Sequence, residues 1–126
     1  MKEIIKENQL IESILNQYKT ELNKDIDSYK NHVYRVFNYA LVLDSETENT
    51  EKYAITAAFH DLGIWTHSFD YLEHSIALAT EYLIENNQQN WVEEVSLMID
   101  NHHRRSSYRG EFNEIVNVFR KSDWID

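Results

Sequence analysis

The chain has 126 residues, of which 42% are hydrophobic and 13% aromatic, as expected for one folded domain rather than a disordered segment. It has no proline, no cysteine and only two glycines, which excludes disulfides and thiolate metal sites and favours helices joined by short loops. With 22 acidic and 12 basic residues, its net charge of −10 argues against binding extended nucleic acid through the outer surface.

No apolar run approaches the roughly 18 residues that a transmembrane helix needs, and the charged, periodic N-terminus is unlike a secretory signal. We therefore expect a cytoplasmic protein that does not engage a membrane. The sequence contains no internal repeat and no low-complexity segment, so residues 1–126 are predicted to form a single domain.

The first 43 residues predict two helices. Residues 1–22 carry an amphipathic stripe of isoleucine, leucine and tyrosine at helical spacing. A polar break separates this stripe from a second helix, which is capped by Asp27 or Ser28 and ends near Leu43. His32 lies among the apolar residues of this second helix, so its ring requires a polar partner inside the core.

The third predicted helix covers residues 51–62. It is rich in alanine, which lets neighbouring helices approach closely, and it ends with the adjacent pair His60 and Asp61. Gly63 follows in a position that favours a left-handed helix stop. Residues 64–69 are expected to form a loop.

The second half of the chain predicts three more helices. The first starts at Asp70, whose spacing to Glu73 is that of a capping box. The second runs from Trp91 to about His103, and the last starts near Phe112 after a basic loop. The chain is therefore predicted to be all-α, a single-domain bundle of five to six helices.

Four histidines and two aspartates lie on or beside the apolar faces of these helices, or where a helix ends: His32, His60, Asp61, His74, His102 and Asp123. Each has a simpler interpretation on its own, because a histidine on an apolar stripe is commonly a hydrogen-bonded core residue and Asp123 could emerge into solvent. Together they would leave six polar groups in one core, which a single hydrogen-bond network does not easily satisfy. Nitrogen and oxygen donors without sulfur suit one or two divalent ions of Fe, Mn, Ni, Zn or Mg.

The order His32, then His60-Asp61, then Asp123 resembles the signature of the HD-domain superfamily of metal-dependent phosphohydrolases. The resemblance spans roughly residues 31–126 and implies an HD-domain-like helical fold. It further implies that these four residues hold a first metal ion.

The branch of this superfamily with two metal ions has further histidines, which His74 and His102 resemble. In that comparison Asp61 would bridge to a second metal bound by these two residues. His103 is the alternative to His102, either as a further ligand or as a hydrogen-bonding neighbour of the ligands.

The resemblance implies hydrolysis of a nucleotide or another small phosphate ester, with Asp61 in the catalytic centre as the bridging ligand. Arg104 and Arg105 could bind phosphate oxygens, and His67 could protonate the leaving group. The alternatives are an exposed basic loop and an exposed histidine without a role. A mixed-valent diiron oxygenase of the same fold and a non-catalytic module that binds a small ligand are the competing functions.

Two departures from the family pattern narrow these expectations. Ile64 stands where the branch that hydrolyses cyclic dinucleotides usually has lysine, and no Gly-Tyr-Pro segment follows, which argues against cyclic dinucleotides as substrates. The chain ends three residues after Asp123 within a predicted helix, which leaves open whether the domain is truncated at its C-terminus. The apolar stripe from Ile4 to Leu22 is the candidate surface for a homodimer, unless it covers the core.

Overall fold

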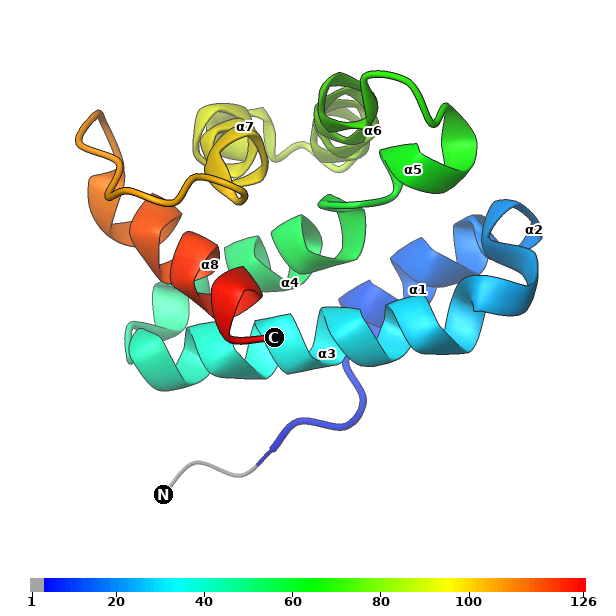
Figure 1. Ribbon diagram of the computed structural model, residues 1–126, viewed down its shortest axis with the longest axis horizontal. Helices are drawn as coiled ribbons and strands as arrows, with labels where there is room; N and C mark the ends of the chain where they lie inside the picture. Colours follow the sequence, from blue (N-terminus) through cyan, green and yellow to red (C-terminus); the bar gives the residue numbers. More distant parts are fainter. Residues whose placement is uncertain (1–3) are drawn as a thin grey trace.

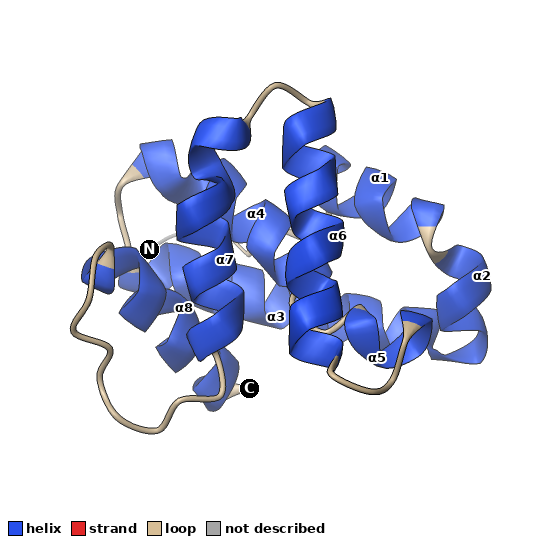
Figure 2. Ribbon diagram, turned by 90° about the horizontal axis from the view of Figure 1, so that it is seen from above, coloured by secondary structure: helices blue, strands red, loops and turns tan. Residues whose placement is uncertain are grey.

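The computed structural model describes residues 4–126, which form helices and loops without a strand in this range (Figure 1, Figure 2). The α-helices are, in chain order, α1 Gln9–Gln17, α2 Lys19–Leu22, α3 Ile26–Leu43, α4 Thr50–Phe59, α5 Gly63–Thr66, α6 Tyr71–Glu85, α7 Val92–Asn101 and α8 Asn113–Ile125. Three 3-10 turns, η1 Asn23–Asp25, η2 Thr47–Asn49 and η3 Gln89–Trp91, lead into α3, α4 and α7. Because α2 and α5 are single turns of four residues, six longer helices remain, and the predicted all-α bundle of five to six helices is confirmed.

Helix α4 lies at the centre of the bundle. All residues from 53 to 60 are buried, and the helix contacts α1 and α3 on one side and α6 and α7 on the other (Figure 1). Alanines at 54, 57 and 58 are small enough for these neighbours to approach closely. Helix α8 packs on α3 and α7, both of which also contact α4. The end of α4 is therefore surrounded by α3, α7 and α8. No helix within residues 4–126 has the length and apolarity needed to cross a bilayer.

The first helix starts later than its apolar stripe predicts. It begins at Gln9 because the side chain of Asn8 caps it, with Asn8 Oδ1 accepting from the Ile11 N–H at 3.1 Å. The Ile5 N–H instead donates to Asn38 Oδ1 on α3 at 2.8 Å, so residues 4–8 run along α3 without helical structure. Residues 1–3 of the predicted helix lie outside the described residues.

From Ile11 onward this stripe covers the core. Ile11, Ile14 and Leu15 are 0% exposed, whereas Ile4 is 73% exposed. These three residues therefore cover the core, which was one of the two roles considered for the stripe. A homodimer stays a prediction.

Gly63 does not adopt the left-handed backbone predicted for it. Its φ is not positive, and it begins α5, whereas the preceding helix ends at Phe59. Glycine is required here for close approach, because a Cβ would overlap the carbonyl oxygen of Tyr71 and lie 2.9 Å from Ser75 Oγ. The Gly63 N–H donates to Ser75 Oγ at 2.8 Å. Part of the loop expected at residues 64–69 is consequently helical.

Two predicted caps do not form: Asp70 stands at the N-cap position of α6, as predicted, but makes no capping hydrogen bond, and Asp27 and Ser28 are not at the N-cap position of α3. Asp70 has a φ of 52°, and its side chain accepts no capping hydrogen bond, because side-chain capping requires an extended backbone that this left-handed conformation does not provide. Asp27 and Ser28 lie within the first turn of α3, which starts at Ile26 directly after η1.

Candidate metal centre

His60 and Asp61 follow the last turn of α4, in the centre of the bundle. The His60 ring is fully buried, and its Nδ1 lies 2.6 Å from the Ala57 carbonyl oxygen. A carbonyl oxygen can only accept, so Nδ1 carries a proton and Nε2 is the ring nitrogen that faces the interior.

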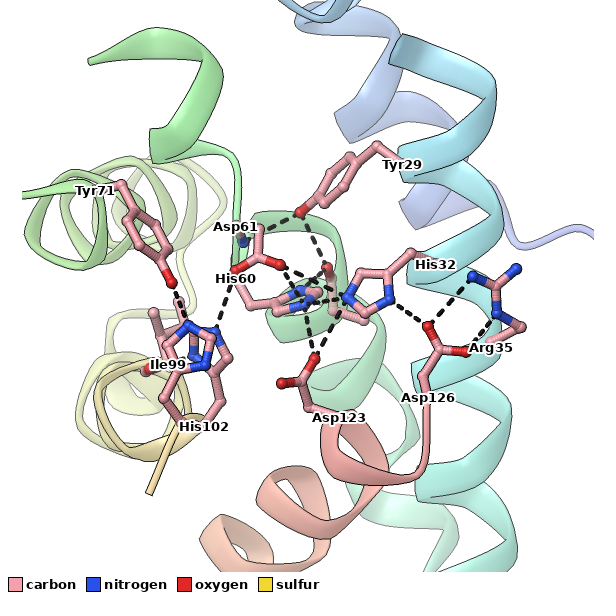
Figure 3. Close-up of polar contacts among 12 residues, drawn as sticks. Tyr29, His32, Arg35, His60, Asp61, Tyr71, Ile99, His102, Asp123 and Asp126 are labelled. Atoms are coloured by element: carbon pink, nitrogen blue, oxygen red, sulfur yellow. Dashed lines mark hydrogen bonds and ion pairs between the residues drawn. The ribbon is translucent and has the colours of Figure 1, made fainter. Parts of the chain in front are cut away.

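A first group of donors forms around His60 Nε2, with one residue each from α3 and α8 (Figure 3). His32 Nε2 lies 3.0 Å from His60 Nε2, and Asp61 Oδ2 lies 3.2 Å from it. Asp123 Oδ1 lies 3.4 Å from His60 Nε2 and 3.3 Å from His32 Nε2. The structure therefore brings together His32, His60, Asp61 and Asp123, the four residues that the resemblance assigns to a first metal.

A second group forms around the other oxygen of Asp61. Asp61 Oδ1 lies 3.1 Å from His102 Nε2, and the His102 Nδ1–H donates to the Ile99 carbonyl at 2.5 Å. Donor atoms of Asp61, His102 and His103 all lie within 4.8 Å of one another. The His103 ring is exposed, and its Nε2 hydrogen-bonds the hydroxyl of Tyr71. The second group thus contains both adjacent histidines between which the sequence left the choice open.

Charge within the first group favours protonated rings and ionised carboxylates. The hydrogen bond with Asp123, followed by that with Asp61, raises the pKa of His32 from 6.5 to about 10. Burial would lower the pKa of His60, but the charge of Asp61 and the hydrogen bond with Asp123 raise it to about 9. Burial likewise opposes ionisation of Asp61 and Asp123, yet the surrounding imidazoles hold the pKa of both carboxyl groups well below the usual range. A positive charge is therefore stabilised at the point where the donors converge.

Tyr29, which was not predicted from the sequence as a site residue, hydrogen-bonds the backbone at the end of α4 that carries His60 and Asp61. Its buried hydroxyl donates to the Ala58 carbonyl at 2.8 Å and accepts from the Asp61 N–H at 3.2 Å. Burial and the neighbouring carboxylate of Asp61 raise the pKa of Tyr29 well above its usual value. Tyr29 lies three residues before His32 on α3, and this spacing on one helix face is the signal that could have identified it.

The structure does not bring His74 or His67 into either group of donors. The two rings stack on each other, with centroids 3.6 Å apart and planes inclined by 3°. His67 is exposed, at the end of α5, and its Nδ1 is paired with Thr66 Oγ1 at 2.8 Å.

Arg104 and Arg105 begin the exposed loop that follows His103. The Arg104 carbonyl accepts from Trp124 Nε1 at 3.3 Å and from the nearly buried Arg120 at 3.5 Å. The Arg105 guanidinium lies 5.9 Å from the centre of the Trp124 ring. The backbone of the loop is therefore fixed to α8, while Arg104 and Arg105 are exposed.

The two groups fit one or two divalent cations in their donor chemistry. All their donors are nitrogen or oxygen, and backbone carbonyls fix the protons of His60 and His102 so that Nε2 of each ring can bind a metal. Asp61 belongs to both groups, with one oxygen directed to each. This is the arrangement expected of a carboxylate that bridges two cations.

Comparisons with known proteins give one match. The family model described as the HD domain matches residues 29–126. This range begins at Tyr29 and contains both donor groups. Searches of curated proteins and of solved structures found no match.

Proposed function

Because the chain belongs to the HD-domain family, whose members are generally metal-dependent hydrolases, we propose that it hydrolyses a nucleotide or another small phosphate ester. The observation that carries the proposal is the position of Asp61, whose two oxygens face separate sets of imidazole nitrogens. A carboxylate with one oxygen facing each set of ligands suits phosphate-ester hydrolysis, because it can hold two cations close enough to act on one phosphoryl group. We expect the protein to act in the cytoplasm.

In this proposal the first cation is held by His32, His60, Asp61 and Asp123, and a second by Asp61 with His102 and His103. Divalent cations bound there would polarise the phosphoryl group and lower the pKa of the attacking water. Tyr29 keeps the Asp61 backbone in place, and the carbonyls of α4 and α7 keep the buried rings oriented. For His74 to join the second cation, its ring would have to leave the stack with His67.

Substrate binding is assigned to Arg104 and Arg105, because the chain as a whole is strongly acidic and would otherwise repel a phosphate ester. Their forked guanidinium groups match the oxygens of a phosphate, and the loop that carries them follows His103 directly in the chain and is anchored to α8. His67 remains our prediction for the group that protonates the leaving oxygen. Replacing both arginines by glutamine should raise KM about tenfold without changing the metal content.

The test is release of phosphate by the metal-loaded protein from a panel of nucleotides, sugar phosphates and cyclic phosphodiesters. We expect turnover of at least one class, and its loss together with the bound metal in Asp61→Asn. Asp27→Asn is the matched control, because Asp27 is an exposed carboxylate of α3 outside both donor groups. Absence of turnover across the panel with fully loaded protein would contradict the proposal.

The same experiment separates the competing functions. A diiron oxygenase would show absorption and electron paramagnetic resonance signals of mixed-valent iron that change on exposure to air, without phosphate release. A binding module would retain a ligand from the panel unchanged. Either result would replace hydrolysis as the function of the site.

A further inference from the structure

The inward orientation of His32 has a different origin from that of the other buried rings. His60 and His102 donate their Nδ1 protons to the carbonyls of Ala57 and Ile99, in the last turns of α4 and α7, where the regular hydrogen bonding of each helix ends. His32 lies in the interior of α3, where the carbonyls of the preceding turn already accept from the helix backbone. Its Nδ1 therefore needs an acceptor from elsewhere.

That acceptor is Asp126, at the end of α8. Asp126 Oδ2 lies 2.5 Å from His32 Nδ1 (Figure 3). Since an ionised carboxylate can only accept, Nδ1 holds the proton and His32 Nε2 is left to face His60, Asp61 and Asp123.

Arg35 holds this carboxylate from the opposite side. Its Nε donates to Asp126 Oδ1, and its Nη2 donates to Asp126 Oδ2 at 3.3 Å. Arg35 and His32 are three residues apart on α3 and so share one face of the helix. The Asp126 side chain is 9% exposed, while that of Arg35 is 53% exposed, so the arginine covers the carboxylate from the solvent side.

We propose that Asp126 and Arg35 are positioning residues for metal binding: Asp126 fixes the proton and the ring plane of His32, and Arg35 fixes Asp126. The inference rests on the proposed function, since it needs a cation between the first donors. A carboxylate on the far nitrogen of a histidine ligand orients the ring and makes its free nitrogen more basic, which is worth about 10- to 100-fold in metal affinity. Metal affinity therefore depends on the contact between the end of α8 and α3.

The test is the affinity of the metal-free protein for Zn²⁺, measured by competition with a chelating dye. We expect binding about 10- to 100-fold weaker for Asp126→Ala. Asp126→Asn keeps an oxygen that can accept from Nδ1–H, so it should recover part of the loss. Arg35→Met should weaken binding less than Asp126→Ala, and Arg35→Lys less again. Asp27→Asn removes an exposed carboxylate from α3, the helix of His32 and Arg35, and should bind Zn²⁺ as tightly as the wild type does.

A second readout separates positioning from a loss of folding. In the ¹⁵N spectrum of the zinc-loaded protein, the His32 Nδ1–H should be protected from exchange with water in the wild type and should exchange faster in Asp126→Ala, where its acceptor is gone. Circular dichroism of the metal-free variants should match that of the wild type. Equal zinc affinity and an unchanged His32 spectrum in Asp126→Ala would overturn the inference while leaving the proposed function intact. A wild-type protein that binds no metal would overturn both.

Discussion

His32 and His60 face each other through nitrogens 3.0 Å apart, a contact that requires one ring to donate and the other to accept. Their other nitrogens donate to Asp126 and to the Ala57 carbonyl, so a proton between the two rings gives the pair a positive charge. In the metal-free protein this proton occupies the place that we assign to a cation. Metal binding and protonation of the pair therefore compete.

This competition predicts opposite pH dependences for stability and for metal affinity. The pKa values of His32 and His60 are raised in the folded protein from 6.5 to about 10 and about 9. Because the folded protein binds these protons more tightly than the unfolded chain, the protonated rings stabilise the folded state fully below pH 6.5. This stabilisation is lost as the pH rises through about 9 and the rings lose their protons. The free energy of unfolding of the chelator-treated protein should therefore fall over that range, while its affinity for Zn²⁺ should rise.

Urea denaturation and zinc titration at several pH values check this prediction. Asp123→Asn is the informative variant, because Asp123 raises the pKa of both rings and its neutralisation should flatten the pH dependence of stability. A wild-type stability that does not change between pH 6.5 and 10 would show that the pair holds no extra proton.

Tyr29 supplies a second prediction about a single residue. Tyr29→Phe removes a hydroxyl that serves the Asp61 N–H and the Ala58 carbonyl, and both of these groups then lack this buried partner. We expect the free energy of unfolding to fall by about 1–3 kcal/mol, measured by urea denaturation. Tyr39→Phe on the same helix is the control, because Tyr39 has no hydrogen-bond partner for its hydroxyl within residues 4–126. Equal losses in the two variants would remove the supporting role of Tyr29.

For single residues, helical spacing beside apolar faces singles out six polar side chains, and the family resemblance assigns four of them to the first donor group. The sequence does not predict that His74 stacks on His67, since His74 satisfies the same periodicity whether it faces the site or His67, and His67 lies in a segment predicted to be a loop. Asp126 and Arg35 were also not identified. Their role depends on where the end of α8 meets α3, which is a tertiary contact and leaves no pattern along the chain.

Among the elements, the six longer helices follow from their apolar stripes, whereas their ends do not. The ends depend on turns whose geometry is set by tertiary contacts, such as the left-handed Asp70 and the 3-10 turn before α3. Asn8 caps α1 within a stripe that continues past it in the sequence, because Ile5 bonds to Asn38 instead of extending the helix. Periodicity alone carries no information about such a choice.

The short helix α5 gives the prediction that belongs to this scale. Gly63→Ala would place a Cβ against the Tyr71 carbonyl oxygen and near Ser75, which forces α5 away from α6. We expect a loss of about 1–3 kcal/mol in the free energy of unfolding.

Gly110→Ala is the matched control for this measurement. There the new Cβ would meet the hydroxyl end of the partly exposed Tyr108 side chain, which can move aside. Thermal or urea denaturation of both variants measures the two losses in the free energy of unfolding. If the two substitutions destabilise equally, close packing between α5 and α6 is not what requires glycine at position 63.

In the whole molecule, distant parts of the chain meet at one point. Helix α3 supplies His32, the end of α4 supplies His60 and Asp61, the end of α7 supplies the adjacent histidines, and α8 supplies Asp123 (Figure 3). This convergence of carboxylates and imidazole nitrogens attracts a cation, and the arginine-bearing loop that follows the histidines attracts an anion despite the net charge of −10. The proposed function requires both.

Elemental analysis of the protein, purified without chelator and reconstituted with metal under anaerobic conditions, shows directly whether the two donor groups hold metal. We expect one or two divalent metal ions per chain in the wild type and their loss in Asp61→Ala, since this carboxylate serves both donor groups. Asp27→Asn should retain the wild-type content. Metal-free wild-type protein after reconstitution, or an Asp61→Ala variant with undiminished metal, would contradict this expectation.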